Sequence, residues 1–279
     1  MAFTKYLDLL SINTDLARRI LVEFVRDEVK RAGFDKAIVG LSGGIDSSLV
    51  ACLAAEALGP DHVLGVRMPY KTSAQESSDH GGLVIETLGI QSETVEITSM
   101  VDPLFALYPD MTRLRTGNVM ARQRMIVLFD RSASFQGLVI GTSNKTESLL
   151  GYTTQFGDNA AAIQPIGDLY KYQVRQLARA MGVPQVIIDK APSADLWPGQ
   201  TDENELGYTY DDADQLLYLL VDRRYKLEEA IEAGFSRAFV ETLWKRVRQM
   251  HYKRHLPVVA KLSQRTVGYD FLYLRDWGT

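Results

Sequence analysis

The chain has 279 residues, of which 46% are hydrophobic and 24% are charged, and its formal net charge is −4. These values fit a globular protein of one large domain, and the missing basic surplus argues against a nucleic-acid partner. The one cysteine excludes an internal disulfide, no apolar run is long enough to span a membrane, and the N-terminus lacks the pattern of a cleavable signal. We therefore expect a cytoplasmic protein that is not attached to a membrane.

Apolar runs that alternate with amphipathic segments predict a parallel sheet with helical crossovers. The strands are expected at 37–41, 63–68, 94–97, 138–141 and 186–188. The helices are expected at 14–31, from 45 onwards, and at about 74–88, 118–134 and 169–181. We therefore predict a doubly wound α/β fold with a mainly five-stranded parallel sheet and helices on both faces. In such sheets ligands bind at the carboxyl ends of the strands.

The first strand leads into the turn SGGIDSS at 42–48 and then directly into a helix. A glycine turn at a helix N-terminus offers free N–H groups to an anion, although the Gly-Lys-Ser/Thr ending of the common P-loop is absent. Asp46 would repel a polyphosphate unless a cation lay between them, which predicts a nucleoside triphosphate with Mg²⁺. The alternative is that Asp46 and the serines only cap the helix.

A second polar turn, GTSNKTE at 141–147, follows the fourth strand. Glu147 would face Asp46 across the sheet edge, and two such carboxylates are a credible Mg²⁺ pair. Alternatively, Asn144 and Glu147 form a capping box that starts the next helix. Thr142 would contact a phosphate or a ribose.

The remainder of the chain reads as a long loop followed by helices. The polar, proline-containing segment 190–207 is typical of a lid. The chain is expected to be helical from 210 to about 253, and the aromatic tail Tyr269, Phe271, Tyr273 and Trp277 to be extended. We expect a single domain over 1–279, with an N-terminal helical segment at 1–36, a nucleotide-binding core at 37–192, and the lid loop, C-terminal helices and tail at 193–279.

Six motifs occur in order between about 37 and 257: SGGIDSS, GNVMARQRM, GTSNKTE, GYTTQFGD, PIGDLYK and APSADLWPGQTDE. Together they resemble the ammonia-dependent NAD synthetases, a family of the ATP pyrophosphatase (PP-loop) superfamily with an adenine nucleotide alpha hydrolase-like fold. The resemblance implies that ATP adenylates the carboxylate of nicotinic acid adenine dinucleotide (deamido-NAD) with loss of pyrophosphate. Ammonia then displaces AMP to give NAD⁺.

Two alternatives stay open beside this interpretation. Another PP-loop amidotransferase, such as the ATP pyrophosphatase subunit of a GMP synthetase, shares the glycine loop but lacks GYTTQFGD followed by PIGDLYK. A regulator that holds ATP without turnover would be expected to lack the pair Asp46 and Glu147, and both residues are present.

The resemblance implies a role for each matching position. Asp46 and Glu147 would hold Mg²⁺, and Asp46 and Lys171 would be catalytic. The dinucleotide would contact Arg122, Gln155 and Lys253. ATP would contact Gly40, Leu41, Ser42, Gly43, Gly44, Ile45, Asp46, Ser47, Thr142, Lys171 and Ser193. Taken without the motifs, Arg122 and Lys171 would be solvated charges on helix surfaces.

The sequence departs from many family members at four positions. Where many members have a lysine, an aspartate and a threonine, this sequence has Gln155, Ala162 and Ser193. Tyr252 occupies the position of the histidine in a His-Lys pair. Ser193 keeps a hydroxyl. The other three bear on how the dinucleotide is held, not on the use of ATP.

The expected nitrogen source is ammonia. A glutamine-hydrolysing domain would need its own nucleophilic cysteine and a few hundred further residues. Cys52 lies within the helix after the loop and reads as a small buried hydrophobe. We therefore expect free ammonia, or ammonia from a separate protein, to be the donor. The resemblance also implies a homodimer with the substrate site near the interface.

Overall fold

The computed structural model describes residues 5–193, 195–197, 199–255 and 257–270. Its centre is a sheet of four parallel strands in the order β3-β2-β1-β4. The strands are β1 (Lys36–Gly40), β2 (Val63–Arg67), β3 (Gln91–Thr94) and β4 (Gly137–Ile140). β1 lies between β2 and β4, so that Ile38 is paired with Leu64 on one side and Val139 on the other. The loop that follows β1 therefore leaves the middle of the sheet.

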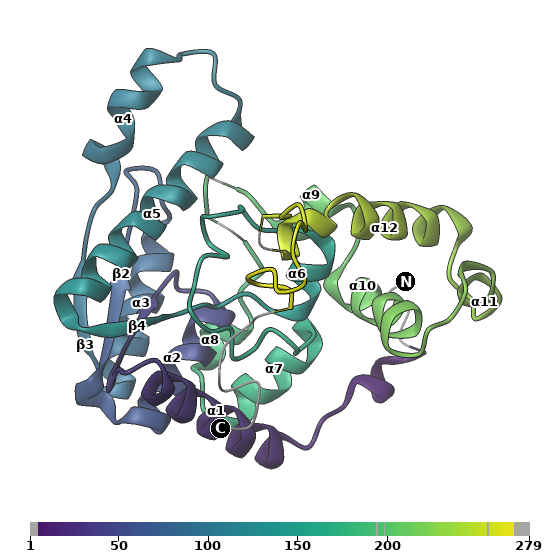
Figure 1. The fold of residues 1–279 in the computed structure, drawn as a ribbon, viewed down its shortest axis with the longest axis horizontal. Helices are drawn as coiled ribbons and strands as arrows, with labels where there is room; N and C mark the ends of the chain where they lie inside the picture. Colours follow the sequence, from purple (N-terminus) through teal and green to yellow (C-terminus); the bar gives the residue numbers. More distant parts are fainter. Residues whose placement is uncertain (1–4, 194, 198, 256, 271–279) are drawn as a thin grey trace.

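Helices cover both faces of this sheet (Figure 1). On one face the core includes residues of α1 (Thr14–Arg31), α2 (Ile45–Leu58), α3 (Gln75–Leu88) and α7 (Lys171–Ala180). On the other face the core includes residues of α5 (Arg113–Phe135) and of α4 (Thr98–Leu107) with its N-cap Ile97. Ala37 and Val39 belong to the first core and Ile38 to the second, and all three are fully buried. Burial on both faces explains why β1 is apolar without alternation from Ala37 to Val39.

The expected fifth strand at 186–188 is wrong. These residues belong to a short helix, α8 (Gln185–Ile188), that begins after Pro184. A three-residue apolar run does not distinguish a buried strand from a buried helical turn, and here Ile187 and Ile188 pack into the helical side of the core. Beside β4 the structure has a single parallel bridge between Ile140 and Ile163.

Other differences concern the ends and number of helices. β3 lies at 91–94 and not at 94–97, although the N–H groups of Val95 and Ile97 continue the hydrogen bonding toward β2. The sequence did not predict α4. The expected loop at 190–207 contains a short helix, α9 (Asp202–Leu206). Phe271, Tyr273 and Trp277 of the predicted aromatic tail lie outside the described residues, while Tyr269 is half exposed.

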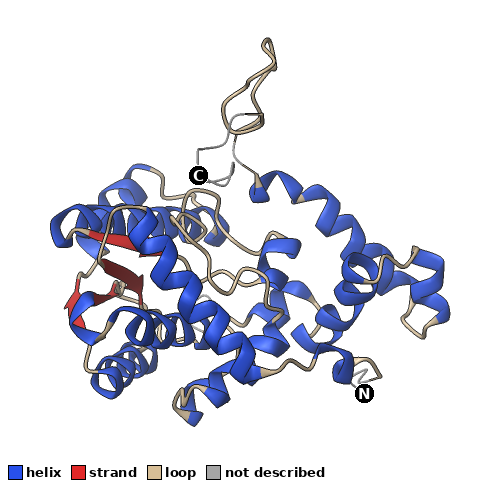
Figure 2. Ribbon diagram, turned by 60° about the horizontal axis from the view of Figure 1, so that its bottom comes forward, coloured by secondary structure: helices blue, strands red, loops and turns tan. Residues whose placement is uncertain are grey.

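A second group of helices lies beside the sheet (Figure 2). It contains α10 (Tyr210–Leu217), the π-helical turn η3 (Tyr218–Asp222), α11 (Leu227–Glu232) and α12 (Arg237–Gln249). Short helices complete it, namely η1 (Leu7–Leu10), α6 (Lys145–Leu150) and η4 (His251–Arg254). Its separate hydrophobic core includes Leu150 of α6. α6 thus joins the carboxyl edge of the sheet to this second group.

Candidate functional site

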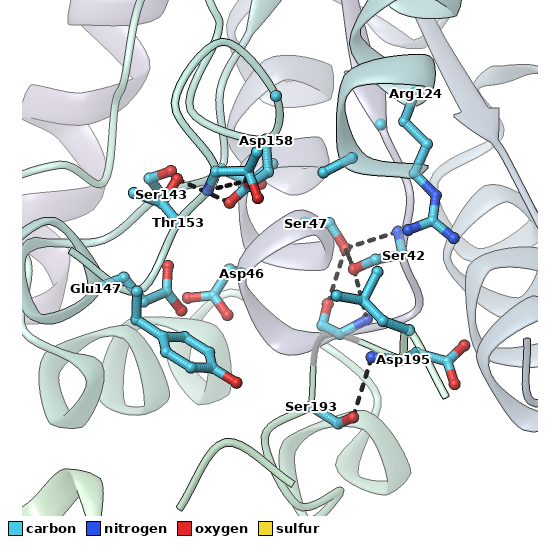
Figure 3. A pocket seen from close by; sticks show the side chains of 18 of the residues that line it. Ser42, Asp46, Ser47, Arg124, Ser143, Glu147, Thr153, Asp158, Ser193 and Asp195 are labelled. Carbon is cyan, nitrogen blue, oxygen red and sulfur yellow. Dashed lines mark hydrogen bonds between the residues drawn. The ribbon is translucent and has the colours of Figure 1, made fainter. Parts of the chain in front are cut away.

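A cavity of about 800 Å³ opens at the carboxyl ends of β1 and β4 (Figure 3). Its walls come from the β1–α2 turn, the β4–α6 turn, the first residue of α7, one side of α5 and the segment after α8. Fourteen of the predicted site residues line it: Gly40, Leu41, Ser42, Gly44, Ile45, Asp46, Ser47, Arg122, Thr142, Glu147, Gln155, Lys171, Ser193 and Lys253. The topology therefore brings the predicted ATP, metal and dinucleotide residues to one space.

Gly43 is the predicted site residue that does not line the cavity. Its φ is +74°, and a Cβ atom there would lie 2.1 Å from the carbonyl oxygen of Ser77. This glycine is required because the turn passes closely over the first turn of α3, and only glycine combines that φ with that approach. Its contribution is thus to the shape of the turn.

The serine hydroxyls of the turn are satisfied within it. Ser47 Oγ and Ser48 Oγ donate to the Gly44 carbonyl at 3.0 and 2.8 Å, and Ser47 Oγ lies 3.1 Å from Ser42 Oγ. Gly44 is the N-cap of α2, and no side chain caps the helix there. The alternative in which Asp46 only caps α2 is therefore wrong, because its carboxylate is turned toward other partners.

Lys171 is the centre of the site. Its Nζ donates to Asp46 Oδ2 at 2.5 Å and to Glu147 Oε1 at 3.2 Å, and it lies 5.0 Å from the centroid of the Tyr210 ring. The side chain is only 3% exposed, so the alternative of a solvated surface charge is wrong. Figure 3 shows the carboxylates of Asp46 and Glu147 pointing toward each other from the first turns of α2 and α6.

Burial sets the charge balance of this cluster. It raises the pKa of Glu147 to about 8; the charge of Lys171 opposes this shift, and those of Asp46 and Asp202 add to it. Burial alone would lower the pKa of Lys171, but the charges of Asp46 and Glu147 outweigh it and hold the pKa above its usual value. The lysine is therefore charged, and the raised pKa of Glu147 means that a cation binding beside Asp46 would compete with a proton for the Glu147 carboxylate.

The capping box expected at Asn144 and Glu147 is present, and it leaves Glu147 Oε1 facing the cavity cluster. Asn144 is the N-cap of α6: its Oδ1 accepts from Glu147 N at 2.9 Å, and Glu147 Oε2 accepts from Asn144 N at 3.3 Å. The amide Nδ2 of Asn144 also donates to Asp46 Oδ1 at 2.9 Å. The capping box thus fixes Glu147 and, through Asn144, orients Asp46.

The donor set fits magnesium. Asp46 and Glu147 offer carboxylate oxygens that share one ammonium, whereas the described residues contain no group of three or more His, Cys, Asp or Glu side chains arranged for a metal. Mg²⁺ is usually held by one or two carboxylates, with phosphate oxygens and water in the remaining positions. Two carboxylates beside a turn suited to phosphate match that requirement.

The predicted dinucleotide residues lie together at another part of the cavity wall. Arg122 Nε donates to the Gln155 carbonyl at 3.3 Å. Lys253 Nζ donates to the carbonyls of Gly151 and Thr153 at 2.8 and 2.7 Å, and burial lowers its pKa. In this structure the ammonium of Lys253 therefore anchors the loop that carries Gln155. Of the four departures from the family pattern, Gln155, Ser193 and Tyr252 line the cavity, while Ala162 is exposed and lies outside it.

The segment after α8 covers a further side of the cavity and is tied to α3. Lys190 Nζ donates to Ser77 Oγ at 2.9 Å, and the Asp195 carboxylate accepts from Ala74 N at 3.2 Å. Ser193 Oγ accepts from Asp195 N at 3.0 Å. In this structure these bonds hold Lys190 and Asp195, at the start of the expected lid, against the start of α3.

Arg124 and Asp202 are two of the polar cavity-lining residues that sequence reasoning did not single out. Arg124 lies one helical half-turn beyond Arg122, its Nε donates to the Met68 carbonyl at 3.0 Å, and burial lowers its pKa. Figure 3 shows its guanidinium directed toward the turn that holds Ser42. Asp202 accepts from the hydroxyls of Tyr152 and Tyr210, both at 3.1 Å. The motif ARQRM could have indicated Arg124, but nothing local indicates the pairing of Asp202.

Comparison with known proteins decides the family. The family model described as NAD synthase matches residues 17–257. The chain belongs to the NAD synthase family. A curated relative from Trichlorobacter lovleyi, named NH(3)-dependent NAD(+) synthetase, is 57% identical over 269 residues, which cover 96% of this chain and 98% of that protein. The resemblance found in the motifs is thereby confirmed.

Solved structures agree with this assignment to the NAD synthase family. An NMN synthetase from Francisella tularensis superposes with a TM-score of 0.80 at 32% identity, over 90% of this chain and 100% of that one. An NH3-dependent NAD synthetase from Campylobacter jejuni superposes with a TM-score of 0.77 at 30% identity, again over 90% and 100%. The GMP synthetase alternative finds no support among these relatives. Within the described residues, no helix combines the length and the apolar character needed to cross a bilayer.

Proposed function

We propose that this chain amidates nicotinic acid adenine dinucleotide to NAD⁺ with ammonia, converting ATP to AMP and pyrophosphate. The observation that carries the proposal is the cluster of Asp46, Lys171 and Glu147 inside the cavity of a NAD synthase family member. The cluster combines a fixed cation with the two carboxylates that the chemistry of ATP cleavage needs.

The reaction concentrates negative charge on the phosphates, and the site contains donors that can stabilise it. In the first step the substrate carboxylate attacks the α-phosphate, and pyrophosphate leaves with the electron pair of the broken P–O bond. The ammonium of Lys171 and the N–H groups of the turn at 42–48 are donors that can stabilise the charge that develops there. Asp46 and Glu147 would hold Mg²⁺, which when bound supplies charge neutralisation between the carboxylates and the phosphates.

In the second step ammonia attacks the acyl carbon, AMP leaves, and one proton is released as the amide forms. The substrate must therefore be held with its carboxylate toward the ATP site. We propose that Arg122, Gln155 and the loop anchored by Lys253 hold the dinucleotide. Arg124 would contact an anionic group between the two substrates, because Nη1 and Nη2 make no hydrogen bond within the part of the chain that the structure describes.

An assay with protein, ATP, Mg²⁺, ammonium and the acid dinucleotide tests the proposal. We expect equal amounts of NAD⁺, AMP and pyrophosphate, and little product when glutamine replaces ammonium. Release of ADP would refute the proposal, and so would conversion of xanthosine monophosphate but not of the dinucleotide.

The likeness to an NMN synthetase supports a second candidate, amidation of the corresponding mononucleotide. Relatives at 50–57% identity are named NAD(+) synthetases, which favours the dinucleotide. Measuring kcat/KM for both acids decides between them. A higher kcat/KM for the mononucleotide would replace the first candidate by the second.

We also propose that the chain forms a homodimer through α4 and α5. Large apolar side chains are exposed there, including Leu107 and Leu114 at 71% and Ile126 at 53%. An apolar face of this kind is typical of a surface that a partner covers. Light scattering should give twice the mass of the chain, and Leu114→Glu should give the mass of one chain.

We propose that the protein is located in the cytoplasm. Its one cysteine is buried and unpaired, which fits a reducing compartment.

A further inference from the structure

A carboxylate of the C-terminal helical group lies directly behind the site. Asp214 of α10 is fully buried. Its Oδ1 accepts from the Thr146 hydroxyl at 2.5 Å, and its Oδ2 accepts from Tyr172 N at 2.7 Å. A carboxylate is costly to bury, so its position is tied to the donors that satisfy it.

Thr146 connects this carboxylate to the residues that face the cavity. It is fully buried, it precedes Glu147 in the first turn of α6, and its Oγ1 accepts from Lys171 N at 3.0 Å. The N–H groups of Lys171 and Tyr172 belong to the first turn of α7, where no helical carbonyl is available to them. Thr146 and Asp214 therefore provide the acceptors for the start of α7 and join it to the start of α6.

The link spans the two residues whose side chains must meet. Glu147 directly follows Thr146, Lys171 itself donates its N–H to Thr146, and the side chains of Glu147 and Lys171 meet at 3.2 Å. A shift of α6 relative to α7 would change this distance and the direction in which Glu147 faces Asp46. The charges of Arg175 and Asp211 also act on Asp214, but these two side chains form an ion pair with each other at 2.6 Å. The hydrogen bonds to Asp214 therefore come from Thr146 and Tyr172.

We propose that Thr146 and Asp214 form a positioning pair that holds Glu147 and Lys171 in the geometry needed to bind Mg²⁺–ATP and to cleave it. The proposal rests on the proposed function for its catalytic part, but not for the part that concerns Mg²⁺–ATP binding. Neither residue touches the substrates. The effect passes through the N-termini of α6 and α7.

Three variants test the pair. Thr146→Val keeps the shape of the side chain and removes the hydroxyl, Thr146→Ser keeps the hydroxyl, and Asp214→Asn removes the charge. Ser132→Ala is the matched control, because the Ser132 hydroxyl donates to the Gly137 carbonyl at 2.6 Å and lies outside the cavity wall. Thermal unfolding, kcat, KM and the calorimetric Kd of Mg²⁺–ATP are measured for each variant.

We expect Thr146→Val to lower kcat and to weaken Mg²⁺–ATP binding by about 10- to 100-fold, as loss of a supporting hydrogen bond does at metal sites. Thr146→Ser should stay within about threefold of the parent protein in both, which is well below that supporting-bond range. Asp214→Asn should follow Thr146→Val, and it gives the answer if the valine variant does not fold. Ser132→Ala should lower only the unfolding temperature.

The outcomes separate the two proposals. If the parent protein makes no NAD⁺ but Thr146→Val still loses Mg²⁺–ATP affinity, the pair stands and the proposed function fails. If the parent protein makes NAD⁺ and Thr146→Val keeps kcat and the Kd of Mg²⁺–ATP within about threefold, far inside the expected loss, the pair is refuted. A loss confined to thermal stability in all four variants also refutes it.

Discussion

Replacing Lys171 by methionine removes the ammonium that Asp46 and Glu147 share and leaves a side chain of similar length. Removing one partner of a buried ion pair costs about 3–5 kcal/mol of unfolding free energy. The side chains of Asp46 and Glu147 are 17% and 16% exposed, so water can still reach them. Glu147 can also be neutral without the lysine, because burial raises its pKa to about 8. We therefore expect the lower end of this range, about 3 kcal/mol, or a fall in Tm of about 6–10 °C.

Adding Mg²⁺ should change the stability of the Lys171 variant more than that of the parent protein. In Lys171→Met the cation can take the place of the ammonium, so at ten times its Kd it should restore roughly 1.4 kcal/mol of stability. The parent protein should gain less. Activity should not recover, because loss of a donor to the developing charge lowers kcat by on the order of 10²–10³.

The assay is urea unfolding followed by intrinsic fluorescence at pH 7.5, with EDTA or with Mg²⁺, together with release of AMP. Lys171→Arg is the control, since it keeps the charge and should lose less stability than the methionine variant. If Lys171→Met is as stable as the parent protein in EDTA, and Mg²⁺ stabilises both equally, the cluster does not have the electrostatic role inferred from its geometry.

Three further predictions concern the turn and the helix that follows it. Asp46→Asn can still accept from Asn144 Nδ2 but loses its charge, and AMP release should fall by at least about 10². Gly43→Ala should lower the unfolding free energy by about 2–5 kcal/mol, because its Cβ would meet Ser77 O at 2.1 Å at a φ of +74°. Burial raises the pKa of Cys52 to about 11, so the thiol is neutral at pH 8 and should react with a disulfide reagent only in denaturant.

Each of these predictions has a matched comparison. Near-normal turnover by Asp46→Asn would remove the basis for its metal role. Gly44→Ala is the control for Gly43→Ala, because Gly44 has a negative φ and its Cβ would meet only Ser42 Oγ at 3.3 Å. Equal stability of the two alanine variants would contradict the steric explanation. Rapid labelling of Cys52 in the folded protein at pH 8 would show that the thiol is accessible after all.

The order of strands and helices was predictable where a local pattern has one solution. The apolar run of β1, the glycine turn and the long helix α2 follow one another without interruption, and the structure confirms all three. The prediction was wrong where a pattern is short. The run at 186–188 has too few residues to show a period, so tertiary packing made it a helix.

The sequence by itself determined the local elements of the predicted site. The turn at 42–48 and the carboxylates of Asp46 and Glu147 follow from residue type and spacing, because anion binding at a helix N-terminus and metal binding by carboxylates are local properties. The tertiary structure decided which groups share a charge. Lys171 is 125 residues from Asp46, and it stands between Asp46 and Glu147 only because α6, α7 and β1 converge at one edge of the sheet. Lys253, predicted to contact the dinucleotide, lines the cavity and also donates to two carbonyls of a loop about 100 residues away in the chain. Such pairings depend on distances in space, which the order of residues along the chain does not contain.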